Sequence, residues 1–284
     1  MENKTDYTIG MMCDVLEVSR SSYYNWQSGR TFKPKKHKEN MQIQIRNIYF
    51  QHKQRYGSPR IAAELRANGI QTSKQTVARY VKELELRSKR SKKYVATTDS
   101  KHNNRVFENI LNRRFNQQFL QGAWVSDITY IQTKDGFLYQ TAIIDLEDRK
   151  VIGCSHSEDL SAEHTTLSAF RMAIKNRPPK KDLIFHSDRG VQYTCSSFVN
   201  LLNSYGVTQS MCRKGNCWDN AVVESYFKTL KSELIYGNKL VSKQEMKSML
   251  FEYVEVYYSQ NRRHSALGNL TIKEFTELKL KKIA

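Results

Sequence analysis

The chain has 284 residues, 39% of them hydrophobic, so we expect two or three packed domains, and no apolar run is long enough to cross a membrane. Five cysteines without a CxxC pair argue against disulfides and zinc, and the start of the chain lacks the layout of a signal peptide, so we expect a cytoplasmic protein. The net charge is +18, and residues 1–115 hold 24 Lys and Arg against 10 Asp and Glu, which predicts a polyanionic partner such as DNA.

Residues 1–35 are expected to form a first, small helix-turn-helix. Apolar residues recur at helical spacing between Ile9 and Leu16, and Ser19 is a candidate N-cap for a second short helix. Arg20 would then lie at the start of the helix that faces DNA. A helical hairpin without any ligand fits the same pattern, so both interpretations stay open.

Residues 36–86 are expected to form a second helical DNA-binding domain, also of the helix-turn-helix kind. Its middle helix is predicted to have Ser58 as N-cap and Pro59 in the first helical position, and Ser73 is predicted to cap a third helix. The third helix has an apolar stripe that begins at Val77, and its opposite face is suited to phosphate and base contacts. The polar side chains of that face are Lys74, Gln75 and Arg79.

Residues 87–115 are predicted to be a basic linker. The stretch "RSKRSKK" places five cations in seven residues, and such a segment can lie along the phosphate backbone of DNA. A solvated tether without specific contacts is equally compatible with this composition. If the linker binds DNA, the expected contacts are Arg87, Lys89 and Arg90.

Residues 116–238 change to alternating strands and helices. Three strands are predicted first, with a hairpin turn at Asp135, and then helix, strand, helix, strand and a long helix that contains Glu224. This order predicts an α/β domain with a ribonuclease H-like fold, a mixed five-stranded sheet flanked by helices. Residues 239–284 are expected to form a C-terminal helical extension with Tyr257 on its apolar face, followed by a basic and less regular tail.

Three carboxylates of this region are candidates for chemistry. Asp127 interrupts an apolar strand, where an unpaired charge would be costly, and Asp188 in "LIFHSDRG" ends the fourth strand, which we expect to lie next to the first. Glu224 follows Asp188 after 35 intervening residues. Three converging carboxylates repel one another unless a cation lies between them, and oxygen ligands favour Mg²⁺ or Mn²⁺. Two such ions would activate a nucleophile for phosphoryl transfer.

Each of these residues also has a purely structural interpretation. Asp188 could form a plain turn, and Asp127 could be hydrogen-bonded within the sheet. Glu224 could pair with Lys228 on the surface of its helix. Other acidic residues are expected to be structural only, with Asp145 and Asp148 in a turn and Asp219 as the N-cap of the Glu224 helix.

Five stretches from Trp124 onward carry a family resemblance: "WVSDITYI", "GFLYQTAIIDLEDRKVIG", "LIFHSDRGVQYT", "SMCRKGNCWDNAVVESYFKTLKSEL" and "YYSQNRRHSALG". Together with "RYGSPRIAAEL" upstream they extend over nearly the whole chain. In this order they closely resemble the insertion-sequence transposases of the IS3 family, in the part encoded by the second reading frame (OrfB). The catalytic core of that part is similar to the core of retroviral integrases.

The resemblance implies roles for particular residues. Asp127, Asp188 and Glu224 correspond to the D-D-E metal ligands of the family, and Lys231 matches a basic position that contacts the end of the element. Lys228 shares the helix face of Glu224 and Lys231. Other residues of the motifs are expected to shape the site or touch DNA, namely His186, Ser187, Arg189 and Gln192. A scaffold for the start of the Glu224 helix is expected from Asn216, Trp218, Asp219 and Asn220.

The activity implied by the resemblance is DNA transposition. A metal-activated water would cut one strand at the end of the insertion sequence, and the freed 3′-OH would attack another phosphodiester. The first joining would give a branched figure-eight, which is resolved to a circle before insertion. The implied partners are the element's ends, target DNA, further copies of the chain in a homo-oligomer, and the upstream-frame (OrfA) product or a fusion with it. The implied location is the prokaryotic cytoplasm, at the nucleoid.

Three other functions stay open from the residues alone. A non-catalytic DNA-binding regulator of the element would share the basic first part, and a related ribonuclease H-like nuclease would cut without joining strands. Arg262, Arg263 and His264 invite comparison with tyrosine recombinases, but a separate cluster of the remaining catalytic residues is missing.

Overall fold

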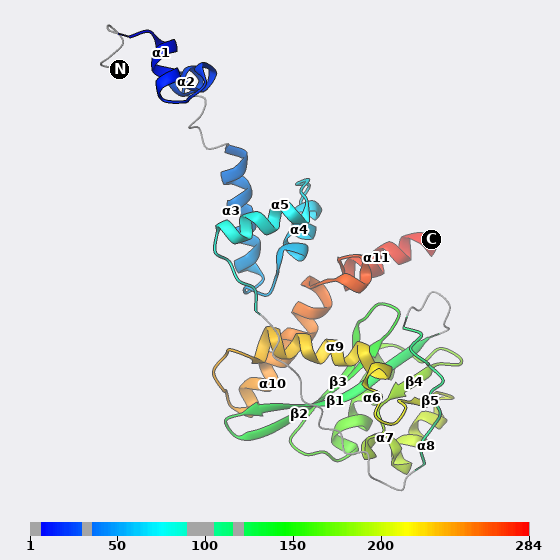
Figure 1. Ribbon diagram of the computed structural model, residues 1–284. Helices are drawn as coiled ribbons and strands as arrows, with labels where there is room; N and C mark the ends of the chain where they lie inside the picture. Colours follow the sequence, from blue (N-terminus) through cyan, green and yellow to red (C-terminus); the bar gives the residue numbers. More distant parts are fainter. Residues whose placement is uncertain (1–6, 30–35, 90–104, 116–121, 284) are drawn as a thin grey trace. The chain divides into compact units, whose positions relative to one another are not determined.

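The computed structural model describes residues 7–29, 36–89, 105–115 and 122–283 (Figure 1). The chain divides into two compact units, Met1–Ser88 and Lys89–Ala284, and each is described by itself. Arg90, one of the predicted DNA contacts, lies outside the described residues. Within the described ranges, no helix is both long and apolar enough to span a bilayer.

The first unit is built from helices. They are α1 (Ile9–Val15), α2 (Arg20–Gln27), α3 (Lys36–Gln51), α4 (Ser58–Ala67) and α5 (Lys74–Glu83). Helices α3, α4 and α5 contact one another in pairs. Their shared core contains the fully buried Ile45, Ile61, Leu65 and Val77, which confirms the apolar stripe predicted for α5.

The helix starts of the first unit follow the capping rules with one exception. The Ser19 hydroxyl accepts a hydrogen bond from the backbone N–H of Ser22, and Ser73 caps α5 in the same way. The prediction for α4 is wrong, because Gly57 is the N-cap and Ser58 is already helical. Gly57 takes the extended conformation that a cap requires and makes no side-chain bond, so the helix begins one residue earlier than predicted.

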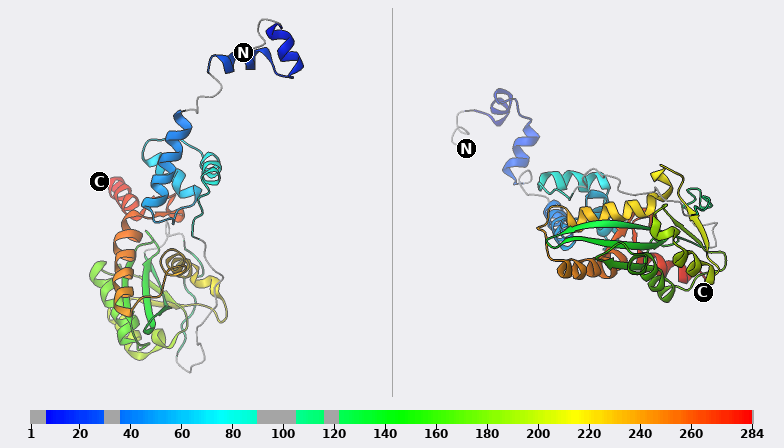
Figure 2. Two further views of the ribbon diagram at one scale, coloured as in Figure 1. Left: turned by 90° about the vertical axis from the view of Figure 1, so that its left-hand side faces the viewer. Right: turned by 90° about the horizontal axis from the view of Figure 1, so that it is seen from below.

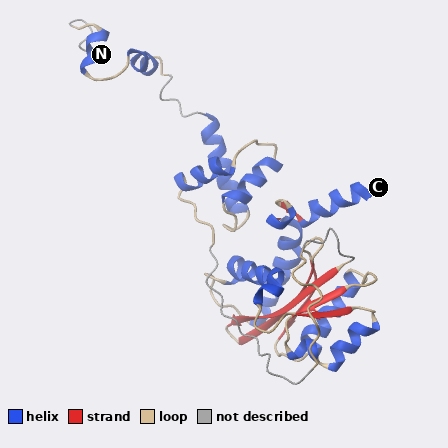
Figure 3. Cartoon of the chain, turned by 45° about the vertical axis from the view of Figure 1, so that its right-hand side comes forward, coloured by secondary structure: helices blue, strands red, loops and turns tan. Residues whose placement is uncertain are grey.

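The second unit is an α/β domain around a mixed sheet, which confirms the predicted ribonuclease H-like fold class (Figure 3). Its strands are β1 (Ala123–Thr133), β2 (Gly136–Asp145), β3 (Val151–Ser157), β4 (Ile184–Ser187) and β5 (Thr208–Met211). The strand order is β3-β2-β1-β4-β5. Strands β1, β2 and β3 form an antiparallel meander, whereas β4 is parallel to both β1 and β5.

Helices cover both faces of this sheet (Figure 2). The α-helices are α6 (Ser168–Asn176), α7 (Val191–Thr194), α8 (Ser196–Ser204), α9 (Ala221–Leu230), α10 (Lys243–Phe251) and α11 (Ile272–Ile283). Wider π-helical turns are η3 (Glu163–Leu167) before α6, η5 (Lys231–Ile235) after α9 and η6 (Glu252–Asn261) after α10. The remaining short elements are the 3₁₀ turns η4 (Cys217–Asn220) and η7 (Ser265–Leu267) and the strands β6 (Arg263–His264) and β7 (Leu270–Thr271).

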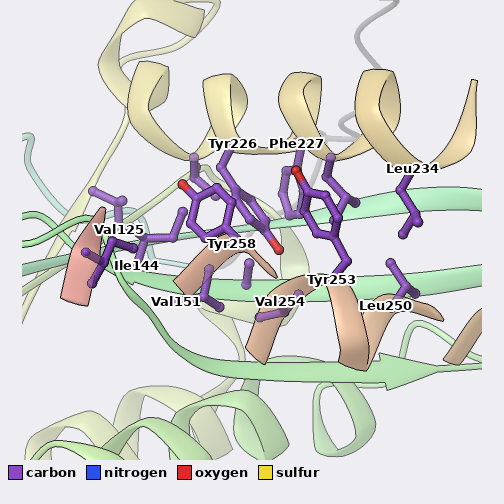
Figure 4. Close-up of a cluster of buried hydrophobic side chains, with 14 of the residues drawn as sticks. Val125, Ile144, Val151, Tyr226, Phe227, Leu234, Leu250, Tyr253, Val254 and Tyr258 are labelled. Carbon is purple, nitrogen blue, oxygen red and sulfur yellow. The ribbon is translucent and has the colours of Figure 1, made fainter. Parts of the chain in front are cut away.

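The two faces of the sheet bury different clusters, because side chains alternate along each strand. Val125 and Ile144 lie on the face covered by α9, α10 and η6, in the same buried cluster as Tyr226, Tyr253 and Tyr258 (Figure 4). The residues adjacent in sequence point to the other face, toward α6 and α8. That second cluster contains Trp124, Ile143, Phe170, Phe185 and Phe198.

One glycine allows the close packing of α6 on the sheet. A Cβ at Gly153 in β3 would collide with the backbone carbonyl of Ala169 and with the side chain of Ala173. Glycine leaves room for both, so α6 can lie directly against β3.

The C-terminal region agrees with the prediction in one respect and differs in two others. Tyr257 was predicted on the apolar face and packs against the hydrophobic core there, although it is only partly covered. Tyr258, which was not predicted to be apolar-facing, is buried in the same core, because the wider π-helical turns of η6 bring an additional residue to that face. The tail, predicted to be less regular, forms β6, β7 and α11. An ion pair of 3.0 Å from the buried Arg263 Nη1 to Glu274 Oε2 helps to hold this structure.

The turn between β2 and β3 agrees with its prediction. Asp145 Oδ1 accepts from the backbone N–H of Glu147 at 2.8 Å, and Asp148 Oδ1 accepts from that of Lys150 at 3.0 Å. Both carboxylates are buried and also pair with Arg177 at the end of α6. The turn is therefore an ionic connection between the sheet and α6.

Candidate active site

Strands β1 and β4 lie side by side and run parallel, and their register brings two carboxylates to the same level. Val125 of β1 pairs with His186 of β4. Asp127 lies two residues beyond Val125, and Asp188 lies two residues beyond His186. The predicted adjacency of the first and fourth strands is confirmed, and it puts Asp127 of β1 beside the turn that directly follows β4 and carries Asp188.

The Asp127 carboxyl is affected by both other candidate carboxylates. Its side chain is half-buried, and Oδ1 accepts a hydrogen bond of 2.8 Å from the backbone N–H of Ile128. Burial raises the pKa of Asp127 well above its ordinary value, and repulsion from Asp188 and Glu224 raises it further. Asp188 and Glu224 therefore both lie within electrostatic reach of Asp127.

Asp188 serves as a turn residue and as a neighbour of Asp127 at the same time. Its Oδ1 accepts a hydrogen bond of 3.0 Å from the backbone N–H of Gly190. A Cβ at Gly190 would lie 3.1 Å from Oδ1 of Asp188 and 3.2 Å from Oε1 of Gln192, so glycine leaves this turn unstrained. The turn interpretation from the sequence is thus correct, and it does not exclude a role in chemistry.

Glu224 reaches the site from the first turn of α9. Burial raises the pKa of Glu224, and the described structure contains no ion pair between it and Lys228, which is exposed. Lys231 is partly buried, which lowers the pKa of its amine, while attraction to Asp127 acts in the opposite direction. Of the two lysines on this face, Lys231 is the one that belongs electrostatically to the carboxylates.

A hydrogen-bonded frame around the carboxylates joins the start of α9 to β1, α7 and β5. Asn220 Nδ2, at the start of α9, donates to the backbone carbonyl of Ser126 in β1 at 3.0 Å. The Ser126 hydroxyl and the Tyr193 hydroxyl of α7 lie 2.8 Å apart, and the Tyr193 carbonyl accepts from Gln209 in β5 at 2.7 Å. Sequence reasoning missed Ser126 and Tyr193. The only signal was their position inside the two strand motifs.

Asp219 is not the N-cap of α9, so that prediction is wrong. Its two oxygens accept hydrogen bonds of 2.7–3.0 Å from the backbone and side chain of Arg213 and from the side chains of Arg113 and Asn109. These partners hold the pKa of Asp219 well below its ordinary value. Asn220 occupies the cap position without a side-chain cap bond, and its Nδ2 donates to the Ser126 carbonyl.

Of the residues expected to form a scaffold before α9, three are hydrogen-bonded within the structure and one is exposed. Asp219 and Asn220 are buried and bonded as a scaffold requires, and Asn216 Oδ1 accepts from Arg113 at 2.8 Å. Trp218 differs, since its side chain is 69% exposed. A packing role therefore accounts for the neighbours of Trp218 and not for Trp218 itself.

Metal binding can be tested on the donor set. No three acidic, histidine or cysteine side chains of the described residues are close enough to form a ready-made metal centre. The chemistry of Asp127, Asp188 and Glu224 nevertheless fits a hard divalent cation, because all donors are carboxylate oxygens whose mutual repulsion such a cation relieves. His186 is fully buried, with Nδ1 2.9 Å from the Ser210 hydroxyl of β5, and burial lowers its pKa to about 4, so it is a structural residue between β4 and β5.

The side chains of two other motif residues donate hydrogen bonds to backbone carbonyls. Arg189 Nε donates to the carbonyl of Cys212 at 2.7 Å, and Gln192 Nε2 donates to that of Leu160 at 3.0 Å. Both side chains are half-buried, so they connect loops around the carboxylates. The exposed side chains among the predicted DNA contacts are Arg20, Lys74, Gln75, Arg79, Arg87 and Lys228, and Lys89 is half-buried.

The Arg262, Arg263 and His264 stretch is buried and paired, which removes the comparison with tyrosine recombinases. Arg262 bonds Glu233 at 2.9 Å, and His264 Nε2 lies 3.1 Å from the carbonyl of Tyr258. With Arg263 bonded to Glu274, all three side chains have structural partners. These three basic residues therefore stabilise the packing of the C-terminal region.

Comparison with family models finds an integrase core domain at residues 120–217 and again at residues 205–271, and an HTH-like domain at residues 36–94. The chain is 36% identical over 276 residues to the transposase InsF for insertion sequence IS3A of Escherichia coli (strain K12), covering 96% of each chain. It is 38% identical over 266 residues to an uncharacterized 31 kDa protein of insertion element IS600 from Shigella sonnei, covering 94% of this chain and 97% of that protein.

Among solved structures, the HTLV-2 integrase catalytic core domain in complex with magnesium aligns with 17% identity and a TM-score of 0.41, over 55% of this chain and 95% of that one. The catalytic core domain of BIV integrase aligns with 18% identity and a TM-score of 0.41, over 58% of this chain and 99% of that one.

Proposed function

This chain belongs to the IS3 family of insertion-sequence transposases, and we propose that Asp127, Asp188 and Glu224 form the active site with which it cuts and joins DNA. The chain is a DNA transposase, an enzyme of the polynucleotidyl transferase class. The observation that carries the site assignment is the parallel register of β1 and β4. This register supports a common location for two aspartates that are 61 residues apart in sequence.

The three carboxylates would hold Mg²⁺ or Mn²⁺, and the proposal is two ions. When bound, these ions would lower the pKa of the attacking water or hydroxyl and stabilise the leaving oxygen. The donor set supports this choice, since Asp127 is held near two other carboxylates that raise its pKa. Oxygen donors of this kind favour hard divalent cations over zinc or copper.

The proposed reaction has two phosphoryl transfers. In the first, a water oxygen bonds to phosphorus and the bond from phosphorus to O3′ breaks, which leaves a 3′-OH and a 5′-phosphate. In the second, that 3′-OH loses its proton to solvent and attacks another phosphodiester in line, which joins the strands and releases a new 3′-OH. Lys231, drawn toward Asp127, would place positive charge near the phosphate of the element's end. The joined products would be a figure-eight and then a circle.

The first unit would supply most of the DNA affinity. Lys74, Gln75 and Arg79 are exposed on α5, and the Arg79 guanidinium lies over the ring of Tyr80, at 5.1 Å from its centroid. An exposed polar face of this composition supports contacts to phosphates and base edges. Further contacts would come from Arg20, Arg87, Lys89 and Arg90 along the first part of the chain and from Lys228, Arg189 and Gln192 near the active site.

The proposed partners are the insertion-sequence ends, target DNA, further copies of the chain and the upstream-frame product or its fusion. Two element ends must react together in transposition, so at least two catalytic units are needed. The proposed location is the cytoplasm, at the nucleoid, where the DNA substrate lies.

The test is nicking and strand joining on DNA that carries the element's own ends, with Mg²⁺ or Mn²⁺ present. Asp127→Asn, Asp188→Asn and Glu224→Gln each keep the shape of the side chain but remove its charge. We expect each to lower both reactions by at least about 10³-fold, because each removes a ligand of charge-stabilising ions. DNA binding, measured by fluorescence anisotropy, should be retained.

A matched control is Asp182→Asn, which makes the same chemical change at an exposed position six residues before Asp188. It should react like the wild type. Near-wild-type joining by any one of the three active-site variants would remove that residue from the site. If the wild type nicks the DNA but does not join strands, the chain is instead a nuclease without strand transfer.

A further inference from the structure

Trp218 is the most exposed large aromatic side chain among the described residues, at 69%. It lies in the 3₁₀ turn η4, between β5 and α9. The next two residues are buried, with Asp219 at 0% and Asn220 at 3% exposure. An indole gains considerable free energy when it leaves water, so an exposed one beside two buried polar residues needs an explanation.

The turn that carries Trp218 is firmly held. Asp219 is bonded to both Arg213 and Arg113, and Asn220 is bonded to the backbone carbonyl of Ser126. The exposed indole is therefore presented on a fixed support. A preorganised aromatic group loses little conformational entropy when a ligand stacks on it, which favours binding.

The support leads directly to the active-site carboxylates. Ser126, whose carbonyl accepts from Asn220, immediately precedes Asp127, and Glu224 lies six residues after Trp218. The chain just before Trp218 contributes the exposed Arg213 and Lys214. A basic and polar surrounding favours a nucleic acid over an apolar protein surface as the ligand.

We propose that Trp218 stacks on an unpaired base of the DNA strand bound at Asp127, Asp188 and Glu224, next to the reacting phosphodiester. This inference rests on the function proposed above and adds a binding contact to it. Every base has a π face, so the contact tolerates any sequence, but the base must first leave the duplex. Trp218 would therefore favour DNA ends with unpaired nucleotides and hold the reacting strand in place.

The test compares two duplexes of the same arbitrary sequence, one fully paired and one with three unpaired nucleotides at a 3′ end. Binding is measured with EDTA present, so that no cleavage takes place. We expect the wild type to bind the overhang duplex about tenfold more tightly, because stacking on one base accounts for that or more. Tryptophan fluorescence should be quenched by the overhang duplex more than by the paired duplex.

Four variants separate stacking from other roles. Trp218→Ala and Trp218→Leu should lose the preference for the overhang, whereas Trp218→Phe should keep most of it, because only an aromatic ring stacks. The control Trp26→Ala removes a second exposed indole, in α2 of the first unit, and should leave the ratio of the two affinities unchanged. Equal melting temperatures for the Trp218 variants and the wild type would show that the fold is intact.

Two results would overturn the proposal. One is an unchanged preference in Trp218→Ala, or a preference that Trp218→Leu keeps as fully as the wild type. The other is a loss of self-association in Trp218→Ala during sedimentation without any change in the affinity ratio, which would make Trp218 a protein contact. Asp188→Asn should keep the preference, so stacking and the catalytic assignment can fail independently.

Discussion

Helix α9 is held at each end by an ion pair, and the two pairs differ in how much water reaches them. At its start, Asp219 is buried, but its partners Arg113 and Arg213 are about half exposed, with 44% and 48% of their side chains accessible. Beyond its end, in η5, Glu233 and its partner Arg262 are both buried, and Tyr253 donates to Glu233 at 2.8 Å. Glu224 and Lys231 lie between these two connections.

Because of this difference, we expect the buried pair to affect mainly the stability of the fold and the more exposed pair to affect mainly the position of α9. A buried charge that loses its partner destabilises a fold strongly, whereas an arginine near solvent can regain water. The far connection should therefore determine whether α9 stays packed on the sheet. The near connection, with its partners exposed, should determine where Glu224 and Trp218 lie relative to Asp127.

The largest expected effect comes from breaking the buried pair. Arg262→Met leaves the Glu233 charge buried without its partner and should lower the free energy of unfolding by about 3–5 kcal/mol. Urea unfolding of the second unit, followed by the fluorescence of the buried Trp124, would measure this. Adding Glu233→Gln should recover most of the loss, since the uncompensated charge is then gone. No recovery in the double variant would assign the effect to lost packing of Arg262.

The second-largest loss of stability is expected at Asp219, and this loss should depend on pH. Asp219→Asn weakens charge-assisted hydrogen bonds to two arginines and should cost about 2 kcal/mol at pH 7. The folded pKa of Asp219 is held below its ordinary value, so the charge stabilises the fold above about pH 4 and this contribution fades as the pH falls through the folded pKa. The gap in stability between wild type and variant should shrink from pH 7 to pH 3. A gap that is constant across this range would contradict the ionic explanation.

A smaller loss of stability, with a clear effect on rate, is expected at Asn220. Asn220→Ala removes the bond to the Ser126 carbonyl and should cost about 1 kcal/mol. The rate of strand cleavage should fall about tenfold, because Glu224 is then held less firmly relative to Asp127. DNA affinity should stay within about twofold of the wild type. An unchanged cleavage rate would show that the buried pair alone positions α9.

The smallest effect is expected at the exposed Lys228. Lys228→Gln should change stability by less than about 0.5 kcal/mol and reduce the salt dependence of DNA binding by about one unit of slope. Lys231→Gln removes a partly buried amine that is attracted to Asp127, and unlike Lys228→Gln it should slow cleavage. Equal effects of the two substitutions on the cleavage rate would argue against a role for the Lys231 amine near Asp127.

Sequence reasoning succeeded where local pattern and chain order decide the structure. The order of strands and helices is enough to make β1 and β4 neighbours, and a carboxylate in β1 then lies beside one that directly follows β4. The caps at Ser19 and Ser73 depend on residues three positions away, which a sequence displays directly.

The failures come from partners that are distant in the chain. Asp219 was predicted as a cap, but Arg113, 106 positions earlier, contributes to holding its carboxylate, and no capping rule includes such a residue. The basic residues Arg262 and Arg263 are buried against acids that the sequence pattern did not pair with them. The burial of Tyr258 beside Tyr257 follows from the wider π-helical turns, which a regular helical period cannot anticipate.

The distribution of the three carboxylates over β1, β4 and α9 also has a consequence for a chain that is still being synthesised. Asp127 leaves the ribosome 61 residues before Asp188, and Glu224 follows after a further 36. Pairing of β1 with β4 is a long-range parallel contact, which forms late and slowly. If the proposed site assignment holds, a nascent chain that has already released its basic first unit would be able to hold DNA before its cutting centre is complete. Nicking would then begin only after α9 has packed onto the finished sheet.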